Sequence, residues 1–149
     1  ARQRTERGTY CLGRSMARPV IAFPDATLLV VEYLKAKMPG VSIGSRVPES
    51  RGTGFPEFIR VRRIGGARRT LVTDRPRIDV GCWAGSEGAA WDLMARARAY
   101  ALSMGGAFGG TTVYEVPEVS GPQWVPDAVS GQPKYAFAFE CSVRGTELD

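Results

Sequence analysis

Apolar positions recur along this chain with a helical period in two segments. From Asp25, whose carboxylate can accept hydrogen bonds from first-turn amides, a helix is predicted as far as Pro39-Gly40. From Ser86, a longer helix is predicted as far as Gly105-Gly106. The apolar stripes behind these predictions are Leu28, Val31, Leu34 and Ala36 or Met38 in the first helix, and Ala90, Leu93, Met94, Ala97, Tyr100, Ala101 and Met104 in the second.

Alternating apolar and polar positions predict strands elsewhere in the chain. The predicted strands cover residues 41–43, 58–64, 70–73, 77–83, 112–116 and 134–144. Gly65-Gly66 supplies the positive φ that a tight turn requires, so the second and third of these strands form a predicted β-hairpin. Proline and glycine indicate loops over residues 46–56 and 117–133.

This order of elements predicts an α+β fold: a single domain with a largely antiparallel or mixed β-sheet and two helices packed on one face. The length of 149 residues suits one domain, which is expected over residues 19–149. A flexible basic arm is expected over residues 1–18, interpreted either as functional or as a disordered, vestigial leader. No apolar run approaches the ~18 residues of a membrane span, and no apolar segment follows the basic start as it would in a secretory signal.

Charge is distributed unevenly along the chain. Residues 1–18 carry five arginines and one acidic residue, residues 46–77 carry nine arginines and three acidic residues, and residues 78–149 carry nine acidic and four basic residues. A protein with a cationic and an anionic part can bind copies of itself or neighbours of opposite sign. The net charge of +5 permits contact with nucleic acid without requiring it.

The composition argues against catalysis. There is no histidine, the commonest general acid–base group and metal ligand. The three cysteines lack the paired spacing of a zinc site, and the glycine-rich run 105–110 follows a helix, whereas a phosphate loop precedes one. We therefore expect no enzyme activity, no cofactor and no metal. The remaining alternative is carboxylate chemistry by Asp79, Glu87 and Asp92.

An arginine-rich constellation is the strongest candidate site. Its members are Arg60, Arg62, Arg63, Arg68, Arg69, Arg75 and Arg77. Arginine suits phosphates and protein interfaces better than lysine, so the constellation predicts a surface for DNA phosphates or for an acidic protein partner. The alternative is a solvated sheet face with a mobile tip. Trp124, in the predicted loop 117–133, is either an exposed interface anchor or a side chain that folds back over the sheet.

Three stretches carry a resemblance to a known family. They are Pro24-Asp25 with the helix that follows, residues 77–93 (RIDVGCWAGSEGAAWDL) and residues 133–145 (PKYAFAFECSVRG). Together with the order of elements, they resemble the tail terminator (tail-completion) proteins of long-tailed bacteriophages, especially those of actinobacterial hosts. The resemblance covers about residues 20–145, and residues 1–18 match nothing in the family.

The resemblance implies a structural virion protein that is made in the bacterial cytoplasm and located in the tail–neck region of the virion. Proteins of this kind form a hexameric ring on the head-proximal end of the tail tube, stop its polymerisation and face the head-side connector. The expected partners are other copies of the chain, the tail tube protein, a head-side neck or stopper protein and passing genomic DNA, bound without sequence specificity; no membrane is expected. The arginines and Trp124 then face either the ring lumen or a subunit or partner interface. The alternatives are another neck component, such as a head-side stopper or adaptor, and a non-sequence-specific DNA-binding module that uses the arginine hairpin.

Overall fold

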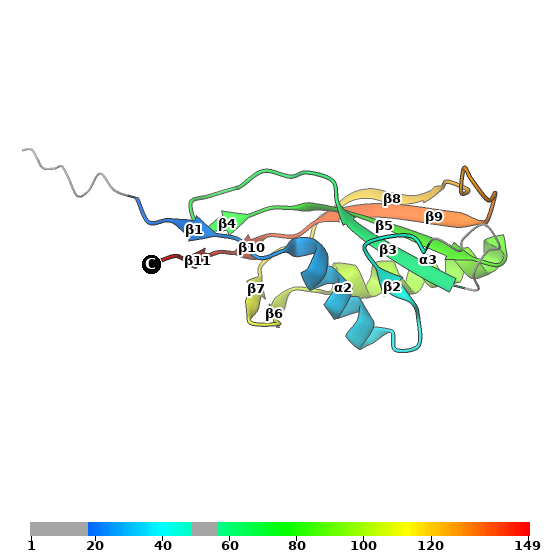
Figure 1. Ribbon diagram of the computed structural model, residues 1–149, viewed down its shortest axis with the longest axis horizontal. Helices are drawn as coiled ribbons and strands as arrows, with labels where there is room; N and C mark the ends of the chain where they lie inside the picture. Colours follow the sequence, from blue (N-terminus) through cyan, green and yellow to red (C-terminus); the bar gives the residue numbers. More distant parts are fainter. Residues whose placement is uncertain (1–17, 49–56) are drawn as a thin grey trace, which may run out of the picture.

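In the computed structural model, which describes residues 18–48 and 57–149, two helices lie on one face of a five-stranded sheet (Figure 1). The strand order is β2-β3-β5-β9-β8, with β2 parallel to β3 and the other neighbours antiparallel. The elements are α2 (Ala26–Lys37), α3 (Glu87–Leu102), β2 (Ile43–Gly44), β3 (Glu57–Arg63), β5 (Arg77–Ala84), β8 (Glu118–Trp124) and β9 (Lys134–Glu140). This arrangement confirms the predicted α+β fold.

Shorter strands lie at one end of the elongated molecule, close to the C-terminus (Figure 1). Four of them form an antiparallel sheet of order β4-β10-β7-β6, and β1 pairs with β11 in a separate ribbon. Their bounds are β1 (Ile21–Ala22), β4 (Thr73–Asp74), β6 (Gly106–Phe108), β7 (Thr111–Val113), β10 (Val143–Arg144) and β11 (Thr146–Glu147). The predicted arm over residues 1–18 falls almost wholly outside the described residues, as does part of the predicted loop 46–56.

The core lies between the helices and the sheet. Alternation along the strands directs one set of side chains towards the helices: Ile59, Val61, Ile78, Val80, Cys82, Phe137 and Phe139, all of which are buried. Three alanines of α3, Ala90, Ala97 and Ala101, are fully buried, and their small size lets the helix approach the sheet closely. Two positions assigned to the helical stripes are instead exposed, Leu28 by 55% and Tyr100 by 38%. In α2 the neighbouring Leu29 and Val30 are buried in their place.

Both helices begin at the predicted caps. The Asp25 carboxylate accepts a hydrogen bond from the Leu28 amide at 3.1 Å, and the Ser86 hydroxyl accepts one from the Ala89 amide at 3.1 Å.

We expect Asp25→Ala to lower the free energy of unfolding by about 0.5–2 kcal/mol, because one first-turn amide loses its acceptor. Urea denaturation measures this loss. Asp25→Asn keeps an acceptor and should retain most of the stability; equal loss in both variants would contradict the capping role.

An ion pair joins α3 to the edge strand β8. Arg98 donates to both carboxylate oxygens of Glu118, from Nε at 2.5 Å and from the terminal nitrogen at 2.7 Å. These hydrogen bonds lower the pKa of Glu118 and raise that of Arg98. A lowered carboxyl pKa means that the stabilisation is present at neutral pH and is lost as pH falls through the pKa of the folded state.

Accordingly, Glu118→Gln should cost about 0.2–1 kcal/mol at pH 7, the range of partly exposed ion pairs. The difference from the wild type should shrink below pH ~4, where unpaired glutamates also become protonated. Urea unfolding at pH 7 and pH 3 compares the two, with the exposed Glu32→Gln as the control. A cost that did not change with pH would show that charge is not its source.

The predicted β-hairpin is wrong in its second strand. β3 pairs with β5, from Glu57 opposite Ala84 to Arg63 opposite Ile78, and not with residues 70–73. The reason is apolar matching: β5 supplies a row of buried side chains opposite that of β3, whereas residues 70–73 are exposed or half-buried. Residues 64–76 therefore leave the sheet as a long excursion between its two central strands.

Two other strand predictions need correction. Residues 118–124 were predicted to lie within a loop, but they form the edge strand β8, which accommodates Pro122 because its pairing with β9 is irregular between Glu118 and Gln123. The predicted strand 134–144 is divided at Cys141 and Ser142, where the chain passes from the large sheet to the small one. The glycine-rich run 105–110 contains β6 and the turn of the β6–β7 hairpin, with positive φ at Gly109 and Gly110 in that turn.

Candidate interaction surface

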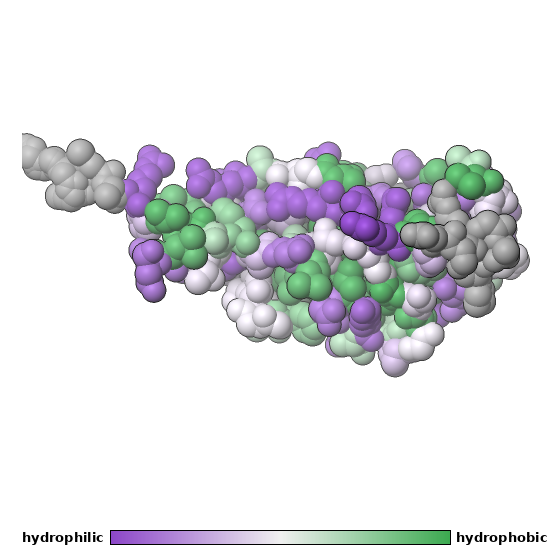
Figure 2. All heavy atoms as spheres, in the orientation of Figure 1, coloured by the Kyte–Doolittle hydropathy of each residue, from purple (hydrophilic) through white to green (hydrophobic). Residues whose placement is uncertain are grey.

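The arginines of β3 are divided between two environments by the alternation of the strand. Because Ile59 and Val61 face the helices, Arg60 and Arg62 project from the opposite face of the sheet. We call that face the outer sheet face. The strand register gives its members: Phe58, Arg60, Arg62, Arg77, Asp79, Gly81, Trp83, Lys134, Ala136, Ala138 and Glu140. Figure 2 shows hydrophilic side chains in a band along the long axis, over β3 and the start of β5.

Arg60 and Arg62 make different contacts there. Arg60 forms an ion pair with Asp79 at 3.2 Å and lies over the Trp83 ring, 5.7 Å from its centroid. The Lys134 ammonium lies over the same ring, at 4.6 Å. Arg62 is exposed and donates to the Ser45 carbonyl at 2.7 Å; within the described residues it has no carboxylate partner.

Arg63 stabilises the excursion that begins after β3. Its guanidinium forms an ion pair with the buried Asp74 at 2.9 Å and donates to the carbonyls of Gly65 and Gly66, both at 2.9 Å. All these acceptors belong to residues 64–76, so Arg63 fastens the excursion to the end of the sheet. Its position indicates a structural role more than contact with a partner.

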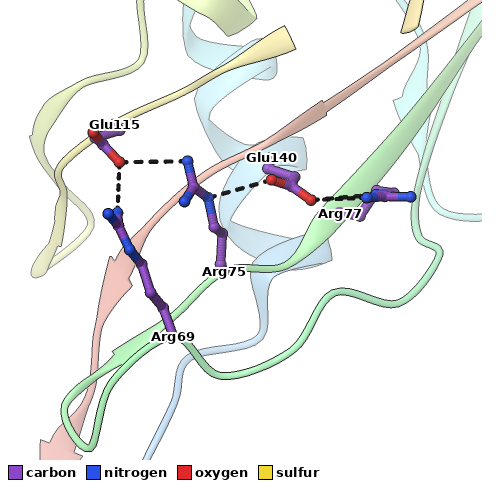
Figure 3. A network of polar contacts seen from close by, with 5 residues as sticks. All are labelled: Arg69, Arg75, Arg77, Glu115 and Glu140. Carbon is purple, nitrogen blue, oxygen red and sulfur yellow. Dashed lines mark hydrogen bonds and ion pairs between the residues drawn. The ribbon is translucent and has the colours of Figure 1, made fainter. Parts of the chain in front are cut away.

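A chain of ion pairs runs across the base of the same excursion (Figure 3). Glu115 accepts from Arg69 at 2.7 Å and from Arg75 at 3.4 Å. Glu140 pairs with Arg75 at 3.3 Å and with Arg77 at 3.0 Å. Both carboxylates come from the acidic part of the sequence, so the opposite charges that lie apart along the chain meet within one molecule. This intramolecular pairing was not anticipated from the sequence.

Arg68 differs from its neighbours. It is exposed, it forms only an isolated backbone bridge with Asp74, and no carboxylate within the described residues pairs with it. Unpaired positive charge in the constellation is therefore concentrated at Arg62 and Arg68. The other five arginines each contact at least one carboxylate.

Trp124 combines the two alternatives that the sequence left open. Its side chain is 46% exposed, and its ring also packs against Tyr135, with centroids 5.2 Å apart. Tyr135 makes an edge-to-face contact with Trp91 of α3, again at 5.2 Å, and Trp91 is also 46% exposed. We call Trp91, Trp124 and Tyr135 the aromatic patch. Trp91 was not among the predicted site residues, although its place off the buried stripe of α3 was a signal of exposure.

Carboxylates border the aromatic patch. The Tyr135 hydroxyl donates to Glu87 at 3.4 Å. The pKa of Tyr135 is raised, mainly by partial burial and to a smaller extent by the negative charge of Glu87. Asp92 is exposed beside Trp91. Asp79 lies on the outer sheet face, whereas Glu87 and Asp92 lie on α3, which covers the other face. The three carboxylates proposed for catalysis are thus on opposite sides of the sheet.

The two cysteines in the described residues lie in the apolar core. Cys82 and Cys141 are buried free thiols, and burial raises the pKa of both, to about 11 for Cys141. No group of acidic and thiol side chains within residues 18–48 and 57–149 is arranged to hold a metal ion. In the same residues, no helix has the length and apolar character to cross a membrane.

These features define a small α+β protein whose exposed surface offers ion-paired arginines and half-exposed aromatic side chains. The particular family follows from comparison with known proteins: the family model for phage tail termination proteins matches residues 22–132, which is most of the chain. The chain belongs to that family, which confirms the resemblance drawn from its sequence. No curated protein matches the chain. The family is one of structural phage tail proteins, so the chain is a tail protein of a bacteriophage.

Proposed function

We propose that copies of this chain form a ring that caps the head-proximal end of the tail tube, stops its polymerisation and joins it to the neck of the virion. The observation that carries the proposal is the match to the tail termination family over residues 22–132. The proposed number of six copies in the ring comes from the family resemblance. The tube protein would bind one side of the ring and a head-side stopper the other, while genomic DNA passes through the centre. The role is structural and involves no chemical reaction.

The ion pairs favour this role over a free DNA-binding module. A phosphate-binding surface needs arginines whose donors are available, and Asp79, Glu115 and Glu140 occupy many of those donors. These carboxylates also repel phosphates. We expect the arginine-rich constellation to bind duplex DNA weakly, with Arg62 and Arg68 as its principal unpaired contacts.

Polymerisation of purified tail tube protein in the presence of the chain tests the proposal. Tubes should stop growing, and an antibody against the chain should label one end of each tube in electron micrographs. A head-side stopper would bind portal-side neck protein and leave tube growth unchanged. Tubes that grow at the same rate, with no label at either end, would contradict the proposed cap.

A further inference from the structure

The outer sheet face contains a groove. Its floor is formed by Ala136 and Ala138 of β9. Their small side chains leave a depression between the larger side chains of β5 and β8. Ile64 and Val119 form an apolar rim and are exposed by 51% and 42%. The groove has a volume of about 230 Å³, which is on the scale of one large aromatic side chain. This floor and rim favour an apolar occupant, while the polar groups of the lining come from Arg77, Asp79, Ser120 and Gln123.

Arg77 and Asp79 line the groove, and cations outnumber carboxylates on the sheet face around it. Five cations lie on or over the outer sheet face, and two carboxylates lie among them. The cations are Arg60, Arg62, Arg75, Arg77 and Lys134, and the carboxylates are Asp79 and Glu140. A partner that inserts an aromatic side chain here would therefore gain from carrying carboxylates beside it.

The aromatic patch has this complementary character. Trp91 and Trp124 are each half-exposed, and half-exposed tryptophans are common anchors of protein interfaces. Glu87 and Asp92 border them, and neither has an ion-pair partner within the described residues; Arg96 lies one turn further along α3. The patch lies on the helix side of the sheet, opposite the groove.

From this complementarity we infer that the aromatic patch of one copy docks against the outer sheet face of the next, a contact that rests on the proposed function. The two patches differ and lie on opposite sides of the protomer, so the contact is heterologous and each copy retains one free patch of each kind. Heterologous contacts of this type close into rings when the rotation between copies permits it. Nucleic acid fits the outer sheet face less well, because its dense row of phosphates meets Asp79 and Glu140 and brings no aromatic side chain to fill the groove.

Two substitutions test the two patches separately. Val119→Asp places a carboxylate on the rim of the groove, and Trp91→Ala removes an anchor from the aromatic patch. Either should raise the chain concentration at half-assembly by about thirtyfold or more, the effect of losing an interface hot spot. The matched controls lie outside both patches: Val20→Asp, at a side chain 63% exposed, and Tyr100→Ala on α3. Circular dichroism verifies folding, and Asp92→Lys replaces Trp91→Ala if that variant does not fold.

Mixing the two variants gives the sharper result. Val119→Asp keeps an intact aromatic patch and Trp91→Ala keeps an intact outer sheet face, so one contact can form between them and no more. Native mass spectrometry should show assemblies for the wild type and the controls, monomers for each variant alone, and a one-to-one dimer for the mixture.

The possible results separate this contact from the proposed function. Variants that assemble like the wild type, or a mixture that stays monomeric, would overturn the contact while leaving the ring intact. If the wild type formed no assembly, either alone or in the presence of tail tubes, both the proposed function and the contact would be contradicted. If Val119→Asp abolished binding to a labelled DNA duplex but left assembly unchanged, the outer sheet face would be a nucleic-acid surface and the contact would be wrong.

Discussion

Replacing Phe139 by alanine should lower the free energy of unfolding by about 3–5 kcal/mol, the largest loss that we expect from a single substitution. Phe139 lies near the C-terminal end of β9, is fully buried and stacks on Phe137 with ring centroids 6.1 Å apart. Its side chain fills the space between the sheet and the helices. Truncation removes both the apolar contacts and the support for its neighbours, leaving a cavity in a close-packed core.

Urea denaturation of Phe139→Ala measures this loss, with Phe139→Leu and Tyr100→Ala as matched variants. The leucine should cost less than about 1.5 kcal/mol because it keeps most of the apolar volume. Tyr100 is 38% exposed, so its replacement should change stability far less. A similar stability for Phe139→Ala and Tyr100→Ala would show that the core does not lie between the helices and β9.

Gly66→Ala should have the next largest effect and should act on the arginine-rich excursion. The φ of Gly66 is +88°, which is unfavourable for residues with a side chain. A Cβ there would lie 2.6 Å from the Arg77 amide nitrogen and closer still to the Arg75 carbonyl oxygen. Because both obstacles are backbone atoms, they cannot move without displacing the start of β5. We expect a loss of about 2 kcal/mol or more.

Two other glycines provide controls for this substitution. Gly65 also has a positive φ, +116°, but a Cβ there meets no atom within 4 Å, so Gly65→Ala should cost only the strain, about 1 kcal/mol. Gly85 has neither a positive φ nor a close neighbour, and Gly85→Ala should be neutral or slightly stabilising. Hydrogen exchange of residues 64–76 should increase in Gly66→Ala alone. Equal stability of the Gly65 and Gly66 variants would contradict the close packing of the excursion against β5.

The elements that local signals specify were predictable from the sequence. Asp25 and Ser86 as caps, the helical stripe of α3 and the alternation of β3 and β5 depend on residues a few positions apart, and each is found in the structure. The small sheet was not predictable in this way. Its strands have only two or three residues, too few to show a period, and β10 pairs with β4 and β7 from distant parts of the chain. The edge strand β8 was obscured by Pro122, which an edge position tolerates.

The candidate site was predictable in its residue types but not in its geometry. The arginines lie close together in the sequence, yet their carboxylate partners lie 11 to 65 positions away along the chain. Only the fold shows that Glu115 and Glu140 lie beside Arg75. Trp124 was identified without its companions Trp91 and Tyr135, because the three come from separate elements. Because these opposite charges pair within one molecule, the charge split alone does not identify the contact between copies. The proposed contact therefore uses the outer sheet face and the aromatic patch.

The most direct test of the terminator role is the length of tails assembled in its absence. Electron microscopy of lysates from a phage in which this gene is disrupted should show tail tubes of irregular, excessive length without heads, and expression of the intact chain should restore tails of uniform length. Tails of normal, uniform length joined to heads in the disrupted phage would contradict the proposal that this protein ends the tube.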